Sequence, residues 1–271
     1  VLMVVPLIKG TQAQPDIFRQ NSYQSVLNAE ANESFGMFDL HQNSRLLEAP
    51  ENLINPKPDF SSQDSLHESE KEIRLPATWT MPAEQIGASI LRRRSTRKFS
   101  GAPVDMDQLG SLMKYAYRPA KEYNQRGPQF FNPAGLDTYI IAQNVLGLDG
   151  GIYYYVPNKH TLRQITKGNF TQESYRCCLW QELGRDASAL VIHTMDLDKG
   201  LASYGDRAYR YAHMDAGHIG ERLSWAGVAQ KVGSSGIGGF FDDEINELLG
   251  LSKDHIIVYL TTLGVSAGEP R

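Results

Sequence analysis

The feature that most constrains the fold is a long helical pattern, from about Asp206 to Val232, that includes three glycines. Its small residues are Ala212, Ala216, Gly217, Gly220 and Gly227. A glycine inside a helix costs about 1 kcal/mol relative to alanine, so three of them need a compensating reason. Close approach of another helix or of a planar ligand would be such a reason. The pattern therefore predicts a long helix that is closely packed against something else.

Two shorter amphipathic helices are predicted before this segment. The first comprises AEQIGASILRR, with apolar residues at Ile86, Ile90 and Leu91, and ends near the arginines. The second is capped by Asp105 or Asp107 and runs to Tyr117 with apolar residues on one face. Each has the apolar spacing of a helix that lies on a core.

Strands are predicted around these helices without a regular βαβ repeat. The apolar stretches lie at residues 138–145, 151–156, 189–195, 233–240 and 255–264. A further helix is predicted between the last two, from its cap Asp242 to its stop Gly250. This order of elements predicts an α+β fold with one mixed sheet wrapped by helices.

Composition divides the chain into two parts. Residues 1–80 are expected to form an N-terminal arm, with one short helix at 34–49 and a polar linker rich in Pro, Ser and charge. Residues 81–271 are expected to form the main domain. The apolar start Val1–Ile8 fits either a buried strand of a larger protein or the end of an export signal within residues 1–13. We favour the strand, and with it a cytoplasmic location.

Composition also excludes several classes of function. The 271 residues carry a net charge of −4, whereas nucleic-acid-binding domains usually have a strong basic excess. No apolar run approaches the roughly 20 residues of a membrane span. The two cysteines are the adjacent pair Cys177 and Cys178, and the sequence has neither a CxxC nor an HExxH motif. We therefore expect no bound metal and no nucleic-acid or membrane partner.

Three stretches remain as candidate binding sites, because the GxGxxG, GxxxxGK[ST] and GxSxG motifs are absent. RRRSTRKFSG, residues 92–101, gathers five cationic side chains beside Ser95. It is either a solvated helix end or an anion site, since arginine presents a rigid fork of donors that matches phosphate. NPAGLDTY (132–139) and GSSGIGGFFDDE (233–244) are glycine-bearing loops whose backbone suits close approach to a ligand. Each stretch, taken alone, is also typical of an ordinary turn or surface.

Together these stretches give the chain a family resemblance. It resembles the nitroreductase superfamily of FMN enzymes, and within it the SagB/ThcOx branch of peptide-azoline dehydrogenases. The similarity is carried by ILRRRSTRKFSG, NPAGLDTYIIAQNVLGLDGGIYYYVPNKHTLRQI, YGDRAYRYAHMDAGHIGERL and GIGGFFDDEINELLGL, and it covers residues 81–265. It implies a nitroreductase-like mixed sheet flanked by helices, with the long helix in a homodimer interface and the flavin between the subunits.

The resemblance also implies which residues hold the cofactor. The RRSxR-like stretch that holds the FMN phosphate and ribityl chain corresponds to Arg93, Arg94, Ser95 and Arg97. The PSGGxL-like loop that borders the flavin corresponds to Asn132, Pro133, Ala134, Gly135 and Leu136, with Asn and Ala in place of the usual Ser and Gly. The backbone placed against the isoalloxazine corresponds to Gly236, Ile237, Gly238 and Gly239.

One departure from the branch bears on the reaction. Its azoline dehydrogenases carry a Lys–Tyr pair, linked to proton removal from the azoline ring, just before the YRxYR-like element. Here ASYGDRAYRYA places Tyr204 at the tyrosine position and Ser203 at the lysine position, with Lys199 nearby. An unactivated serine cannot replace an amine whose pKa burial could pull towards neutrality. We therefore expect Ser203 and Tyr204 to occupy the catalytic positions, with weak or no azoline dehydrogenase activity.

Two classes of function stay open at this point. The first is an FMN-dependent oxidoreductase, similar to SagB-type dehydrogenases, that transfers hydride between flavin and a small or peptide-derived substrate. The alternative is a degenerate family member that binds flavin or a peptide without azoline dehydrogenase activity.

Overall fold

The computed structural model describes residues 65–68, 70–78, 83–117 and 135–268. The predicted helix at 34–49 and the apolar start at 1–13 lie outside the described residues. The described end of the predicted arm contains β1 (Glu72–Arg74), which pairs with the main sheet. The division of the chain at residue 80 stays a prediction.

Seven strands form one sheet in the order β1–β6–β5–β3–β7–β9–β8, and every neighbouring pair is antiparallel. Beside β1, the strands are β3 (Asp137–Ala142), β5 (Gly151–Val156), β6 (Thr161–Lys167), β7 (Ala189–Asp196), β8 (Gly233–Ile237) and β9 (His255–Gly264). A parallel pair is formed by the short strands β2 (Val104–Asp105) and β4 (Val145–Leu146). The predicted α+β class is confirmed, with antiparallel pairing in the seven-stranded sheet and parallel pairing in the two-stranded one.

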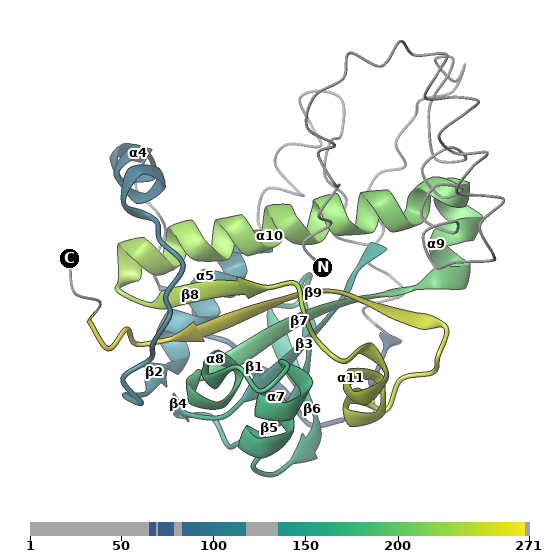
Figure 1. The fold of residues 1–271 in the computed structure, drawn as a ribbon, viewed down its shortest axis with the longest axis horizontal. Helices are drawn as coiled ribbons and strands as arrows, with labels where there is room; N and C mark the ends of the chain where they lie inside the picture. Colours follow the sequence, from purple (N-terminus) through teal and green to yellow (C-terminus); the bar gives the residue numbers. More distant parts are fainter. Residues whose placement is uncertain (1–64, 69, 79–82, 118–134, 269–271) are drawn as a thin grey trace, which may run out of the picture.

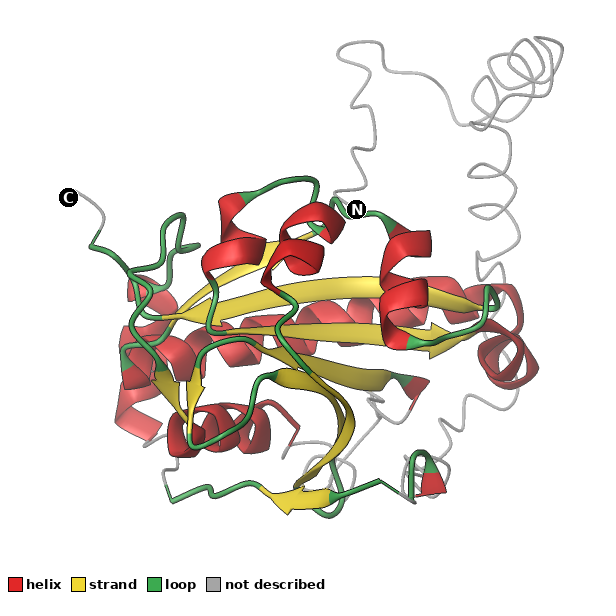
Figure 2. Ribbon diagram, turned by 90° about the horizontal axis from the view of Figure 1, so that it is seen from below, coloured by secondary structure: helices red, strands yellow, loops and turns green. Residues whose placement is uncertain are grey.

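The sheet is apolar on both faces, and this explains its cover of helices. In β3, Tyr139 and Ile141 belong to one core cluster, while Ile140 and Ala142 belong to the other, as the period of a strand requires. The face of Ile140 is covered by α5 (Met106–Tyr117) and α10 (Ala208–Gln230), and the face of Tyr139 by α7 (Thr171–Cys177), α8 (Glu182–Asp186) and α11 (Asp242–Leu249). Helices therefore lie on both sides of the sheet (Figure 1, Figure 2).

Local capping explains where two of the helices begin and end. Asp105 caps α5, because its carboxylate accepts a bond from the Gln108 N–H at 2.6 Å while the Gln108 side chain accepts one from the Asp105 N–H at 3.0 Å. The predicted cap of α11 is wrong, because Asp242 is its first helical residue and Phe241 is the N-cap, without a side-chain bond. The predicted stop is confirmed, since Gly250 lies in the left-handed region with φ 68°.

The strand predicted at 138–145 is interrupted in the structure. β3 ends at Ala142, and β4 begins at Val145. Between them, the N–H groups of Gln143 and Asn144 both donate to the Ser188 carbonyl at 2.9 Å. This shared acceptor turns the chain, and it is too distant in sequence for the apolar pattern to reveal.

The predicted long helix is confirmed as α10, which begins two residues later than Asp206. It follows α9 (Leu197–Tyr204) and a short 3-10 helix, and it ends where Lys231 adopts a left-handed conformation. Towards this C-terminal end it contacts α4 (Ala83–Arg92), as Figure 1 shows. In the described residues, no helix has the length and the apolar composition needed to cross a membrane.

The glycines of α10 differ in what they pack against. A Cβ at Gly220 would lie 2.7 Å from Cε1 of Tyr259 on β9. A Cβ at Gly227 would lie 2.6 Å from the Val232 carbonyl oxygen. A Cβ at Gly217 would meet nothing within 4 Å. Close approach therefore explains Gly220 and Gly227, and for Gly220 the neighbour is a strand of the same chain.

A buried polar cluster lies beneath α5. The Tyr117 hydroxyl contacts Thr138 Oγ1, which lies 3.2 Å from Nδ1 of His193, and all three residues are buried. Nε2 of His193 has no hydrogen-bond partner among the described residues. Burial lowers the pKa of His193 from 6.5 to about 3, so its imidazole is neutral in the folded protein at physiological pH.

The pKa of His193 predicts a loss of stability in acid. The unfolded chain binds a proton at this residue below about pH 6.5, while the folded chain does so only near pH 3. Protonation therefore favours the unfolded chain, and the free energy of unfolding falls as the pH drops below about 6.5. Between those values the wild type should lose about 1.4 kcal/mol per pH unit more than His193→Asn. Urea unfolding at several pH values measures both slopes, and parallel slopes would contradict the prediction.

The packing of Gly220 predicts a destabilising Gly220→Ala substitution. The added methyl group improves helix propensity by about 1 kcal/mol, but overpacking against the Tyr259 ring costs about 1–3 kcal/mol. Gly87→Ala in α4 is the matched control, because a Cβ there meets nothing within 4 Å. Thermal unfolding should place Gly220→Ala below the wild type and Gly87→Ala at or above it. Equal changes in both variants would rule out the contact as the cause.

Candidate functional site

The basic segment, residues 92–101, runs beside the ends of β8 and β9. The Thr96 N–H donates to the Ser234 carbonyl at 2.8 Å, and Phe99 bridges Ser266. Glycine leaves room for this approach, since a Cβ at Gly233 would lie 2.5 Å from Thr96 Oγ1 and one at Gly264 would lie 2.7 Å from Phe99. The segment is therefore held firmly against the sheet by its buried residues, Thr96 and Phe99.

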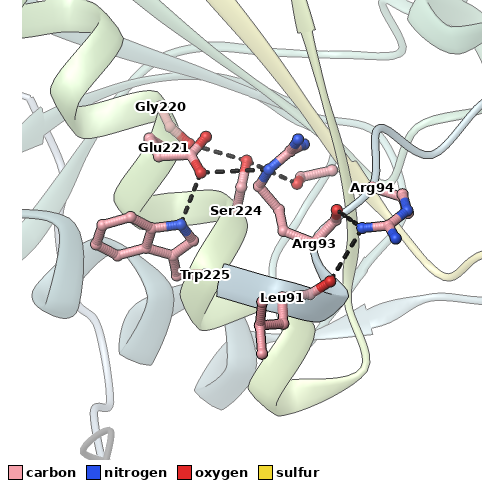
Figure 3. Close-up of polar contacts among 8 residues, drawn as sticks. Leu91, Arg93, Arg94, Gly220, Glu221, Ser224 and Trp225 are labelled. Carbon is pink, nitrogen blue, oxygen red and sulfur yellow. Dashed lines mark hydrogen bonds and ion pairs between the residues drawn. The ribbon is translucent and has the colours of Figure 1, made fainter. Parts of the chain in front are cut away.

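Arg93 forms an ion pair with α10. Its Nε lies 3.2 Å from Oε1 of Glu221, which also accepts a bond from Nε1 of Trp225 at 2.6 Å (Figure 3). The Arg93 and Glu221 side chains are 34% and 46% exposed. Ion pairs with this much exposure are typically worth about 1 kcal/mol or less, so another anion can exchange with the carboxylate.

The other members of the predicted phosphate site differ in their contacts. Nη1 of Arg94 donates to the carbonyls of Leu91 at 3.1 Å and Arg93 at 2.7 Å, where it closes the end of α4 (Figure 3). Ser95 is half-buried and Arg97 is exposed. The segment therefore presents Arg93, Ser95 and Arg97 beside the sheet, with Arg94 turned back on its own helix.

The predicted glycine segment begins on β8 and lies close to Arg93. Gly236 is the last but one residue of β8, and Ile237, Gly238 and Gly239 follow it towards α11. Tyr259 joins the two parts, because a Cβ at Gly236 would lie 1.8 Å from its hydroxyl oxygen. Burial raises the pKa of Tyr259, the Glu221 carboxylate acts in the same direction, and the Arg93 guanidinium acts against both. The Thr96–Ser234 bond and the packing of Tyr259 against both Gly220 and Gly236 bring the basic segment close to the start of the glycine segment.

The remaining predicted residues lie elsewhere. Asn132, Pro133 and Ala134 are outside the described residues, Gly135 is exposed, and Leu136 is buried at the start of β3. Ser203 is exposed near the end of α9, where its Oγ donates to the Lys199 carbonyl at 2.9 Å. Tyr204 packs edge-on against Tyr211, with ring centroids 5.5 Å apart.

Within one chain, the structure separates Leu136, Ser203 and Tyr204 from Arg93 in the basic segment. Asp137, which follows Leu136, pairs with Thr194 at one end of the sheet. Ala142 pairs with Ala189 at the other end, and there Leu263 pairs with both Ala189 and Ser234. The length of β3 alone is about 17 Å. Along α10, Ala208 and Glu221 are about 20 Å apart. The α9 end and the α4 end of α10 are on opposite sides in Figure 1.

Lys199 does not supply the base that Ser203 lacks. Its Nζ lies 2.9 Å from Oδ2 of Asp196, and this hydrogen bond raises the pKa of Lys199. The amine therefore stays protonated at neutral pH, where a general base must be free to accept a proton. Two residues near the basic segment, Glu221 and Tyr259, were not predicted, because neither a glutamate on a helix nor a tyrosine in an apolar strand is a distinctive signal.

The described residues offer no alternative based on a metal or a reactive thiol. No group of three or more His, Cys, Asp or Glu side chains among them could hold a metal ion. Cys177 and Cys178 are buried, and burial raises their pKa values to about 11 and about 12. Such thiols are protonated at neutral pH and are poor nucleophiles.

Comparisons with known proteins agree on one family. The model of the nitroreductase family matches residues 90–265. A putative nitroreductase of Methanocaldococcus jannaschii is 27% identical over 186 residues, which cover 67% of this chain and 91% of the archaeal protein. The crystal structure of a putative nitroreductase from Anabaena variabilis is 37% identical, with a TM-score of 0.74 over 88% of this chain. This chain spans 48% of the length of that protein, about half.

A more distant structure shares the fold alone. The McbBCD microcin synthetase complex of Escherichia coli contains a chain that is 15% identical, with a TM-score of 0.53 over 92% of this chain and the whole of that one.

Proposed function

The chain belongs to the nitroreductase family, whose model matches residues 90–265, and from the motifs of its sequence we propose that it is an FMN-dependent oxidoreductase similar to SagB-type dehydrogenases. The observation that carries the proposal is the close approach of the basic segment to the start of the glycine segment. The Thr96–Ser234 bond brings the donor-rich basic segment next to β8, on which the glycine segment begins, and Tyr259 packs against Gly236. Bound FMN would supply the hydride chemistry.

The donor set of the basic segment fits a phosphate monoester. The guanidinium groups of Arg93 and Arg97 can offer charge-assisted bonds, and the Ser95 hydroxyl lies between them in the chain. Glu221 competes for Arg93, but the exposed pair is weak enough to exchange. Gly236 and Gly239 have no side chain of their own, and Gly236 is exposed, which suits contact with a flat ring.

We further propose a homodimer in which each site draws on both chains. Arg93 lies near the α4 end of α10 and Tyr204 at its α9 end, so one chain alone does not bring these two side chains around one ligand. Met214 is 62% exposed on α10, and the neighbouring Gly217 has open space beyond it. A second copy packed along this side of α10 would bury Met214. It would also approach the helix closely at Gly217, which has no side chain.

Ser203 and Tyr204, near the α9 end of α10, bear on which substrate the enzyme uses. Tyr204 is the remaining member of the proposed proton-transfer pair, and a phenol with a pKa near 10 is a poor base at neutral pH. Ser203 is tied to the Lys199 carbonyl, and Lys199 is held protonated by Asp196. These contacts favour an enzyme that passes hydride to an electron-poor acceptor, with Tyr204 as a proton donor. They also support the second candidate, a family member that binds flavin or a modified peptide without oxidising azolines.

The flavin proposal predicts that Arg93→Ala combined with Arg97→Ala loses the cofactor. Each charge-assisted bond to phosphate is worth about 1.5–3 kcal/mol, so the double variant should purify colourless. Glu221→Gln should bind FMN at least as tightly as the wild type, because it removes a negative charge beside the phosphate, and riboflavin binding should not change. Absorbance of the purified proteins and flavin titration measure these effects.

Lys98→Ala is the matched control for the flavin prediction, because it removes an exposed cation from the same segment. It should keep the wild-type flavin content. Undiminished flavin in the double arginine variant would overturn the assignment, and a flavin-loaded monomer in sedimentation experiments would overturn the shared site.

The serine at position 203 predicts slow azoline oxidation. Conversion of a thiazoline to a thiazole removes a proton and a hydride from the ring, and a positioned base contributes typically about 10²–10⁴-fold to such a step. Ser203→Lys should therefore raise thiazole formation from a thiazoline peptide, while Ser203→Ala should match the wild type. Mass spectrometry detects the loss of two hydrogens. Rapid thiazole formation by the wild type would show that the lysine is not needed.

A further inference from the structure

Two bulky residues between α7 and α8 adopt a backbone conformation that such residues rarely adopt. Leu179 and Trp180 both lie in the left-handed region, with φ 56° and 53°. The Leu179 N–H donates to the Arg176 carbonyl at 3.0 Å, and the Trp180 N–H donates to the Tyr175 carbonyl at 2.9 Å. The strained turn is therefore fixed by its own hydrogen bonds rather than being free to relax.

Burial in the core does not compensate for this strain. Leu179 is 39% exposed and Trp180 is 57% exposed, although both are large apolar side chains. Glycine or asparagine would adopt the same turn at lower cost. Strained backbone persists only where the surrounding structure holds it in place, and it clusters at active sites and binding sites. Exposed apolar side chains on such a backbone therefore indicate a binding site.

The strained turn lies directly against the glycine segment. Cδ1 of Leu179 is 3.1 Å from the position that a Cβ of Gly239 would occupy. The Trp180 ring packs against Phe241 with centroids 5.2 Å apart and an interplanar angle of 80°. The Phe241 N–H donates to the Cys177 carbonyl at 2.9 Å. These contacts place the two exposed side chains against Gly239 at the end of the glycine segment, between α7 and α11.

We propose that Leu179 and Trp180 form a subsite that binds an apolar ring of the substrate beside the glycine segment. This inference rests on the proposed function, because it places the substrate next to the proposed flavin site. A planar ring is the occupant that the residues favour, since an indole offers a broad apolar face and glycine adds no side chain that would block it. The T-shaped contact with Phe241 fixes the indole in advance, which reduces the entropy lost on binding.

The inference predicts opposite effects of Trp180→Asn on folding and on binding. Asparagine tolerates the left-handed region, so the melting temperature should stay equal or rise. The flavin-loaded variant should bind 1,4-naphthoquinone about tenfold more weakly, whereas p-benzoquinone, which lacks the fused ring, should change by about twofold or less. Isothermal titration calorimetry measures both affinities without turnover. In steady-state reduction of the larger quinone, KM should rise while kcat holds.

Leu146→Asn is the matched control, because it also replaces an exposed apolar residue, 66% exposed, away from the glycine segment. It should leave both quinone affinities unchanged. Equal affinity of the wild type and Trp180→Asn for naphthoquinone would overturn the subsite, and so would a lower melting temperature, which would assign Trp180 to the fold. Dissociation of a dimer in Trp180→Asn would instead assign the indole to a subunit contact.

Flavin content separates this inference from the proposed function. A wild-type protein that takes up no FMN would overturn both. A yellow protein in which Trp180→Asn binds the two quinones as the wild type does would overturn the subsite alone.

Discussion

The Tyr259 ring is the contact on which the arrangement of the candidate site depends. It lies between α10 and β8, at two positions where only glycine fits. A Cβ on Gly220 would be 2.7 Å from the ring, and one on Gly236 would be 1.8 Å from the hydroxyl oxygen. This contact fixes how far along β8 and β9 the helix lies, and Glu221, the next residue of α10, then meets Arg93. The packing of one aromatic side chain thus sets the distance between the basic segment and the glycine segment.

The sequence predicts elements well where the signal is local. Glycine and alanine spacing and apolar periodicity predicted α10, and the strand at 151–156 was predicted with its observed bounds. Two of the errors arise where a distant residue decides the outcome. The Ser188 carbonyl ends β3 after Ala142, and no pattern near residue 142 reveals that acceptor. The close approach at Gly220 was expected from a helix or ligand, and the neighbour is Tyr259, which has no distinctive sequence signal.

The candidate site divides in the same way. Arginines around a serine indicate an anion site, and glycines indicate close approach, but neither pattern says that the two stretches meet. Their sequence positions differ by more than a hundred residues, and the backbone bond from Thr96 to Ser234 on β8 brings them together. The separation of Ser203 and Tyr204 from Arg93 follows from the length of α10 and was not predictable residue by residue. If two copies share each site, ligand binding favours the dimer by mass action, so flavin content and assembly are coupled.

Burial distinguishes the arginines of this fold by their role. Arg163 is completely buried on β6, where it donates to the Leu66 carbonyl and pairs with Glu72, so that it ties the segment before β1 to the sheet. Removing a guanidinium from water is costly, and such a residue is retained only with its partners in place. Arg93 keeps a third of its side chain in water and holds a partner that is itself exposed. A weak ion pair orients the guanidinium yet yields to a stronger anion, and this is the property that a reversible phosphate site requires.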